Sequence, residues 1–192
     1  MKKVPEELAT KLNAVADSFL ARGDDARLDQ LAEEIGVPRA TLYYHFSGKD
    51  DLTTFFMQDK LGRVGVRVQE ARNGDGSAIE RFEAALAATV GELCLNPSLC
   101  LQLTAAQGRP AAMVEVMRAM DLAVMSPLRE LLIEARAVGD ADVLDIDLAV
   151  SAALGAVNRA VLHRFATKSE VDADSTSEAT VSLVLNGLRI RD

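Results

Sequence analysis

A short segment between Leu28 and Leu52 constrains the fold more than any other part of the chain. Apolar side chains recur at helical spacing in its first part, which ends at Gly36. Glycine at such a position commonly ends a helix in the left-handed conformation. Pro38 follows two residues later, and proline can begin a helix because the first N–H groups of a helix have no partner. The segment therefore predicts two short helices joined by a tight turn.

The second of these helices is expected to be amphipathic. Leu42 and Phe46 lie on its inner side, where they can pack against Phe19, Leu31 and Ile35 of a three-helix unit. The side chains expected at its tip, on its outer face and on its flanks are Arg39, Ala40, Thr41, Tyr43, Tyr44 and His45. Two helices in this arrangement form a helix-turn-helix, in which the second helix reads DNA.

The polar side chains of this helix suit two kinds of DNA contact. Arg39 at the tip can bond O6 and N7 of a guanine in the major groove. Thr41, Tyr44 and Lys49 suit phosphate contacts, and Lys49 lies at a helix N-terminus that already attracts anions. His45 can contact either a phosphate or a base. Singly these residues are typical of a solvated helix, but together in a two-helix unit they favour DNA binding.

The run GVPRATLYYHFSGKDDL, which follows Ile35, resembles the signature of the TetR (tetracycline-repressor-like) family of transcriptional regulators. The resemblance covers about residues 8–56. It implies an all-helical homodimer with a three-helix DNA-binding head and a larger C-terminal domain. That domain would enclose a small-molecule pocket and dimerise through its last two helices. The resemblance also implies base contacts by Arg39, Ala40 and Tyr44, and backbone contacts by Thr41, Tyr43, His45 and Lys49.

One position departs from the family pattern. The family usually begins the second helix of the head with Ser or Thr, whose hydroxyl also bonds a phosphate, whereas this chain has Arg27 there. Arg27 can offer its charge to a phosphate in place of that contact, and whether it also replaces the Ser or Thr helix cap stays open in the sequence.

The whole chain is expected to be all-α, with about nine helices. Aromatic residues make up 4% and hydrophobic residues 49%, so the core must consist mainly of Ala, Val and Leu. The first helix is expected from Pro5 to Arg22, and a long helix to about Arg72 joins the head to the rest. The expected domains are a DNA-binding head at 1–52 and an effector-binding and dimerisation domain at 53–192. Pro127 is expected to interrupt a long helix that ends at Gly139.

Several side chains of the second domain are candidates for an effector pocket. Met113, Met117 and Met120 form a stripe that could adapt to apolar ligands, with core packing as the alternative. Asn158 and His163 are polar groups on an otherwise apolar helix near 145–165. They could orient a ligand, pair across a dimer or lie exposed.

The same helix is apolar over most of its circumference, which requires burial on two sides. Together with the last helix it predicts a four-helix bundle between two copies. The residues expected at this interface are Leu148, Ala152, Gly155, Leu185 and Leu188.

The formal net charge of −8 disfavours a polyanionic partner, yet no Asp or Glu occurs between Val37 and Lys49. An acidic protein can therefore still present a non-acidic face to phosphate. Cys94 and Cys100 are expected to be free thiols in a reducing cytoplasm, with a redox switch or metal site as the alternative. The first residues lack a signal-peptide core, and the longest apolar run is interrupted by charged residues, so a cytoplasmic protein is expected.

These features predict a repressor that a small, mostly apolar effector releases from a palindromic operator. No catalytic residue, metal or cofactor is assigned. A helical enzyme is disfavoured because the chain has two His residues, no zinc-ligand spacing, no nucleophile elbow and no phosphate loop. A helix-turn-helix protein-interaction module that has lost DNA binding remains the alternative.

Overall fold

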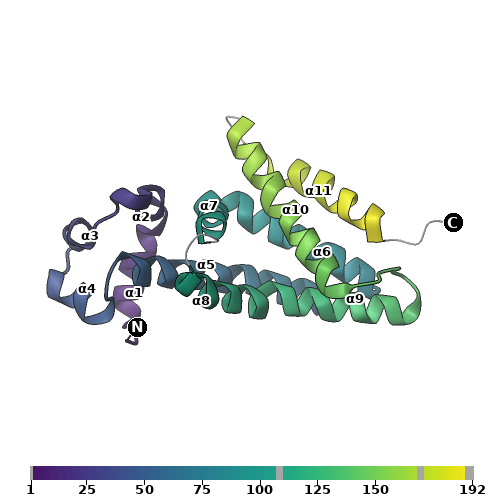
Figure 1. Ribbon diagram of the computed structural model, residues 1–192, viewed down its shortest axis with the longest axis horizontal. Coiled ribbons are helices and arrows are strands. Elements are labelled where there is room, and N and C mark those ends of the chain that lie inside the picture. Colours follow the sequence, from purple (N-terminus) through teal and green to yellow (C-terminus); the bar gives the residue numbers. More distant parts are fainter. Residues whose placement is uncertain (1, 107–109, 168–170, 189–192) are drawn as a thin grey trace.

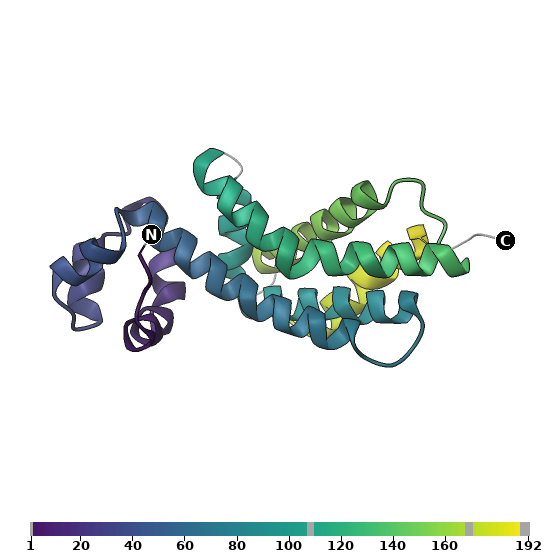
Figure 2. The same cartoon turned by 90° about the horizontal axis from the view of Figure 1, so that it is seen from below.

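The computed structural model describes residues 2–106, 110–167 and 171–188, and the side chains of residues 105–113 and 188 lie outside the description. All the helices and turns in these ranges fit the expected all-helical fold, and none of the described residues forms a strand. The chain forms a small head at one end, a long connecting helix and a helical body (Figure 1). The described ends of the chain lie far apart, the first beside the head and the last beside the body (Figure 2).

The head comprises four helices and a 3₁₀ turn: α1 (Glu6–Ala14), α2 (Ala16–Ala21), the turn Gly23–Asp25, α3 (Leu28–Glu34) and α4 (Arg39–His45). The expectation of one continuous helix from Pro5 to Arg22 is wrong. Val15 leaves the helical region with φ −115° and ψ 5°. The break lets α2 turn and bury Phe19 and Leu20 in the head.

The body comprises the remaining helices: α5 (Lys49–Arg72), α6 (Ala78–Leu95), α7 (Pro97–Ala106), α8 (Pro110–Met120), a π-helical segment η2 (Asp121–Met125), α9 (Ser126–Val138), α10 (Ile146–Thr167) and α11 (Ala173–Leu188). The run α8–η2–α9 lies along α5 (Figure 2). α11 packs on α6 and α10.

Pro127 does not break the long helix but changes its pitch. The N–H of Ser126 donates to the carbonyl of Asp121, five residues earlier, which defines the π segment. Proline has no N–H and its ring crowds the carbonyl four residues before it, so a widened turn accommodates Pro127 within a continuous helix. The break at Val15 and the π-helical segment between α8 and α9 account for eleven α-helices among the described residues, where about nine were expected.

Two hydrophobic cores meet on α5. Leu52 and Phe56 belong to the head core, whereas Met57 and Leu61 belong to the core of the body. Four of the five side chains predicted for the head core are fully buried, and the fifth, Ile35, is half-buried against it. The junction of the cores lies inside the helix that contains the expected boundary at 52/53.

Candidate DNA-binding site

The turn between α3 and α4 is built as the sequence predicts. Gly36 has a left-handed backbone with φ +67°, a conformation that costs a residue with a Cβ. The N–H of Val37 donates to the carbonyl of Ala32 at 2.9 Å, which closes a Schellman-type helix end. Pro38 then precedes the first residue of α4. This local geometry fixes how α4 stands on α3.

α4 presents one face to solvent. Leu42 is fully buried, while Tyr43 and Tyr44 are 53% and 61% exposed. Arg39 and Ala40 are exposed, and Thr41 is half-buried. Two neighbouring exposed aromatic rings beside the exposed Arg39 make this face of α4 a candidate interface.

The candidate role of His45 in contacting DNA is not supported. Its side chain is only 9% exposed. The ring lies edge-on to Tyr44 at 5.0 Å between centroids and 6.4 Å from the ring of Phe46. Nδ1 is buried and has no hydrogen-bond partner among the described residues. His45 lies only 60° round the helix from Leu42, so it faces the core side of α4.

The Arg39 guanidinium is held by acids of α3. It is hydrogen-bonded to Glu33 and lies 3.8 Å from a carboxylate oxygen of Asp29. The hydrogen bond to Glu33 and the charge of Asp29 raise the pKa of Arg39. Its side chain is nevertheless 58% exposed, so a DNA base or phosphate can compete for it.

Lys49 also has an acidic partner within the head. Its Nζ lies 3.0 Å from Asp24 Oδ1 and donates to the carbonyl of Gly23 at 3.3 Å. The lysine that the sequence assigns to phosphate is therefore engaged in an ion pair in this structure.

Arg27 stands at the N-cap of α3 in an extended conformation, and its side chain makes no capping hydrogen bond. The side chain is exposed. The departure from Ser or Thr thus leaves α3 without a side-chain cap.

A polar cluster that the sequence did not suggest joins the head to the body. Lys60 on α5 is buried, and its Nζ lies 2.9 Å from Asp17 Oδ1 of α2 and 2.8 Å from Asn96 Oδ1 between α6 and α7. Ser98 of α7 donates to the same Asp17 oxygen, and Gln102 donates to the carbonyl of Leu20. The only signal in the sequence is a lysine within the apolar stripe of α5.

The candidate effector residues that the structure describes differ in their exposure. The side chain of Met113 lies outside the described residues, Met117 is 40% exposed, and Met120 is half-buried against the body core. Asn158 is half-buried; its Nδ2 donates to Thr104 Oγ1 at 3.3 Å, and its Oδ1 is buried without a partner among the described residues.

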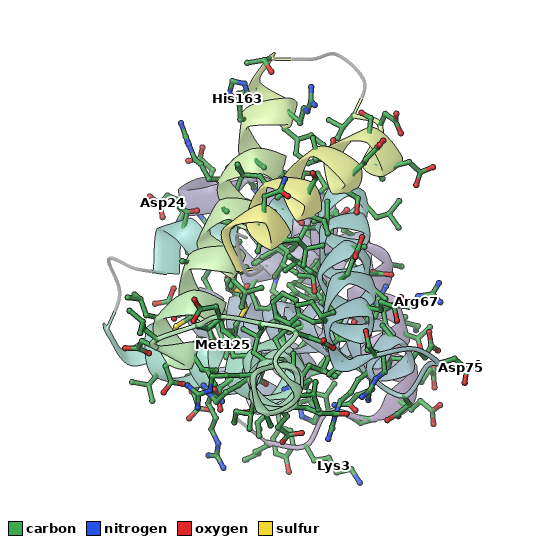
Figure 3. All side chains as sticks on the ribbon, turned by 90° about the vertical axis from the view of Figure 1, so that its right-hand side faces the viewer. Lys3, Asp24, Arg67, Asp75, Met125 and His163 are labelled. Carbon is green, nitrogen blue, oxygen red and sulfur yellow. The ribbon has the colours of Figure 1, made fainter. Side chains whose placement is uncertain are left out.

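The candidate role of His163 in a pocket is not supported. Its side chain is exposed near the end of α10, at the upper edge of the body (Figure 3). Elsewhere, an open and mainly apolar groove of about 610 Å³ runs between α5 and the α8–η2 run. Gly62, Gly65, Val66, Ala119 and Leu122 are among the residues that line it.

The candidate dimer residues divide into two groups. Leu148 is 66% exposed, and Ala152 and Gly155 are exposed beside it on α10. Leu185 is only 4% exposed because α11 packs it into the core of the body, so its assignment to an interface is not supported. The side chain of Leu188 lies outside the described residues.

By length and composition alone, α10 could cross a membrane. The sequence analysis expected charged residues to interrupt the longest apolar run too early for this. A third of its most apolar 18-residue stretch is buried inside the body. α6 and part of α7 are long and apolar enough only when they are taken together, and the two helices are bent by 98° at their junction. α10 supplies Val150, Val157 and Val161 to the body core, as a core helix does.

Comparison with known proteins agrees with this geometry. Residues 12–54 match the family model described as bacterial regulatory proteins, tetR family. No curated protein matches the chain.

Solved structures match the fold over almost the whole chain. The fatty acid degradation regulator FadR from Bacillus halodurans has a TM-score of 0.83 and 22% identity, over 99% of this chain and 100% of that one. FadR from Bacillus subtilis, solved in complex with stearoyl-CoA, has a TM-score of 0.77 and 19% identity, over 93% and 98%. A regulatory protein of the tetR family from Rhodococcus RHA1 has a TM-score of 0.77 and 17% identity, over 98% and 100%.

The sequence match thus lies in the head, and the structural matches extend over almost the whole chain. Residues 12–54 are therefore similar in sequence to the tetR family of bacterial regulatory proteins, and the chain is similar in fold to the solved Rhodococcus structure.

Proposed function

We propose that this protein is a homodimeric, ligand-responsive repressor that leaves a near-palindromic operator when a small, mostly apolar effector binds its body. The observation that carries the proposal is the exposed face of α4, where Arg39, Ala40, Tyr43 and Tyr44 stand clear of the head core. We assign no catalytic role, metal or cofactor to the chain, and we place it in the cytoplasm.

The DNA contacts follow from the positions of these side chains. Arg39, Ala40 and Tyr44 approach base edges, and Arg39 exchanges its acidic partners for a guanine. Thr41, Tyr43 and Lys49 hold the phosphate backbone, and Arg27 adds a charge at the start of α3. A base replaces Glu33 and Asp29 at modest cost because exposed ion pairs contribute little.

The second copy covers the exposed side of α10. Leu148, Ala152 and Gly155 form an apolar, small-residue surface there, and Leu183 of α11 is 70% exposed. Helices with such surfaces pack closely in an isologous four-helix bundle. Two heads joined in this way can enter successive major grooves about 34–36 Å apart.

The effector site that we propose lies where α7 meets α10. Asn158 Oδ1 is a buried acceptor without a partner among the described residues, beside Thr104 of α7. A ligand donor there would satisfy a group that otherwise costs free energy. Because α7 also bonds α2 through Ser98 and Gln102, a shift of α7 reaches the head. Since one structural relative was solved with stearoyl-CoA, a long-chain acyl thioester is the first effector to test.

Operator binding tests the proposal directly. Fluorescence anisotropy with duplex DNA from the flanks of the protein's own gene should show salt-dependent binding that exceeds binding to scrambled duplex. Arg39→Ala should weaken operator binding by about 10-fold or more and relax specificity at one base pair. Arg67→Ala, a charge removed from the body, should leave operator affinity unchanged.

Two outcomes would refute the proposed function: a monomer in solution, or no preference for any flanking duplex. The second outcome is what the protein-interaction alternative predicts, and the acidic partners of Arg39 and Lys49 are the observation in its favour. Added stearoyl-CoA should release the bound duplex, with coenzyme A and stearate as controls that separate the two parts of the ligand.

A further inference from the structure

The segment that precedes α1 lies against the recognition helix α4. The ammonium group of Lys2 stands 3.8 Å from the centroid of the Tyr44 ring, a cation–π contact. Val4 packs partly buried against the head core, and Pro5 holds an extended backbone before α1. Val4 therefore anchors the segment, while Lys2 and Lys3 are exposed beyond it. Lys3 projects away from the molecule at its lower edge (Figure 3).

The charge of most other cations of the head is already neutralised by neighbouring acids. Lys11 pairs with Glu7 at 3.5 Å, Arg22 with Glu34 at 2.7 Å, Lys49 with Asp24 at 3.0 Å, and Arg39 with Asp29 and Glu33. Lys2, Lys3 and Arg27, in contrast, form no ion pair with any described residue. In a chain of net charge −8, positive charge beside α4 that is not committed to an acid is scarce.

We propose that Lys2 and Lys3 form a basic arm that binds the phosphate backbone of duplex DNA next to the base pairs covered by α4. This proposal rests on the proposed function and adds a second contact surface to the helix-turn-helix. A phosphate replaces the Tyr44 ring as the partner of Lys2 easily, because an exposed cation–π contact is weak. The arm contributes affinity and salt dependence but no sequence preference, since phosphates carry no base identity.

The test compares the double variant Lys2→Ala/Lys3→Ala with the wild-type protein in anisotropy titrations over a series of salt concentrations. Each phosphate contact contributes about 0.9 to the slope of log affinity against log salt. Loss of both lysines should therefore lower the slope by about 1.8 for each bound subunit. Affinity for operator and for scrambled duplex should fall by the same factor, because only backbone contacts are lost.

Two further variants isolate the charge of the arm. Lys2→Arg/Lys3→Arg keeps the charge and should retain the wild-type slope. Arg63→Ala/Arg67→Ala removes two charges from exposed side chains of α5 in the body and should also retain it.

If the slope of log affinity against log salt is unchanged in Lys2→Ala/Lys3→Ala, the proposed role of the arm is refuted, even if operator binding is strong. If the wild-type protein binds operator and scrambled duplex equally, the proposed function is refuted. The salt slopes of wild type and Lys2→Ala/Lys3→Ala on either duplex would then still test whether the arm binds phosphates. A wild-type protein that binds neither duplex would refute both.

Discussion

Removal of Asp17 should destabilise this protein much more than removal of its ion-pair partner Lys60. The two side chains meet at 2.9 Å, but their surroundings differ: the Lys60 side chain is 4% exposed and that of Asp17 is 64% exposed. In Asp17→Ala the Lys60 ammonium stays buried with only the Asn96 amide oxygen as a described partner. In Lys60→Met the Asp17 carboxylate stays largely in water and keeps its bond to Ser98.

The expected magnitudes follow from this difference in burial. Leaving a buried charge without its counter-ion costs about 3 kcal/mol or more, so Asp17→Ala should lower the free energy of unfolding by roughly that amount. Methionine fills nearly the same space as the lysine stem, and replacement of a buried charge by an apolar group is often neutral. Lys60→Met should therefore change the free energy of unfolding by less than about 1 kcal/mol.

Urea unfolding, followed by circular dichroism at one fixed protein concentration, measures these changes. With a slope of about 2 kcal/mol per M, Asp17→Ala should lower the midpoint by about 1.5 M. Ser98→Ala serves as the matched control, because it removes the other described partner of the Asp17 carboxylate and leaves the charge pair in place. The double variant Asp17→Ala/Lys60→Met should be close to Lys60→Met alone, since no buried charge then remains.

Equal effects of the two single changes, or additive effects in the double variant, would refute this reasoning.

The pH dependence of the free energy of unfolding provides a second check. Partial burial acts to raise the pKa of Asp17, but hydrogen bonds from Ser98 and Lys60 and the charges of Lys60 and Arg63 outweigh it, so the pKa lies below its usual value. The carboxylate therefore stabilises the folded state above the pKa of the unfolded chain. This stabilisation is lost as the pH falls through the folded pKa, and the gap between wild type and Asp17→Ala should narrow there.

The two thiols should react at very different rates, because burial raises the pKa of Cys100 to about 12 while Cys94 is only partly buried. Alkylation with iodoacetamide at pH 8, read by mass spectrometry, should modify Cys94 first and Cys100 only on unfolding; equal rates in the folded protein would contradict the burial of Cys100. Gly62→Ala should raise the free energy of unfolding by about 0.5–1 kcal/mol, since its Cβ would meet open space in the middle of a helix. Gly65→Val should lower the free energy of unfolding by about 1–3 kcal/mol, because a Cβ there would stand 3.1 Å from Cβ of Ala123. Thermal unfolding measures both glycine variants, and a shift of the midpoint in the same direction for both would contradict this packing.

Local signals were sufficient for the helix-turn-helix. Helical spacing, Gly36 with φ +67° and Pro38 at the start of α4 all act within a few residues, so the turn and the burial of Leu42 and Phe46 followed from the sequence. A local signal also begins α6, where the Ser77 side chain accepts a hydrogen bond from the N–H of Glu80.

Local signals failed where a small difference in helix rotation matters. His45 was expected on a flank of α4, but it lies beside the buried ridge and is 9% exposed. Leu185 lies on the side of α11 that packs against the core of the body, and a stripe of apolar residues does not distinguish such a side from a dimer face. A helical pattern states which residues share a side of a helix, but not which partner covers that side.

Contacts between distant parts of the chain were out of reach of any pattern in the sequence. Asp17 and Ser98 are 81 positions apart, yet they share one hydrogen bond at the junction of head and body. Arg39 and Lys49 carry charges that the sequence assigned to DNA, and the fold places Glu33 and Asp24 beside them. Spacing and turn residues dictate helices because their interactions are local, whereas charge pairing and burial depend on which helices the whole core brings together.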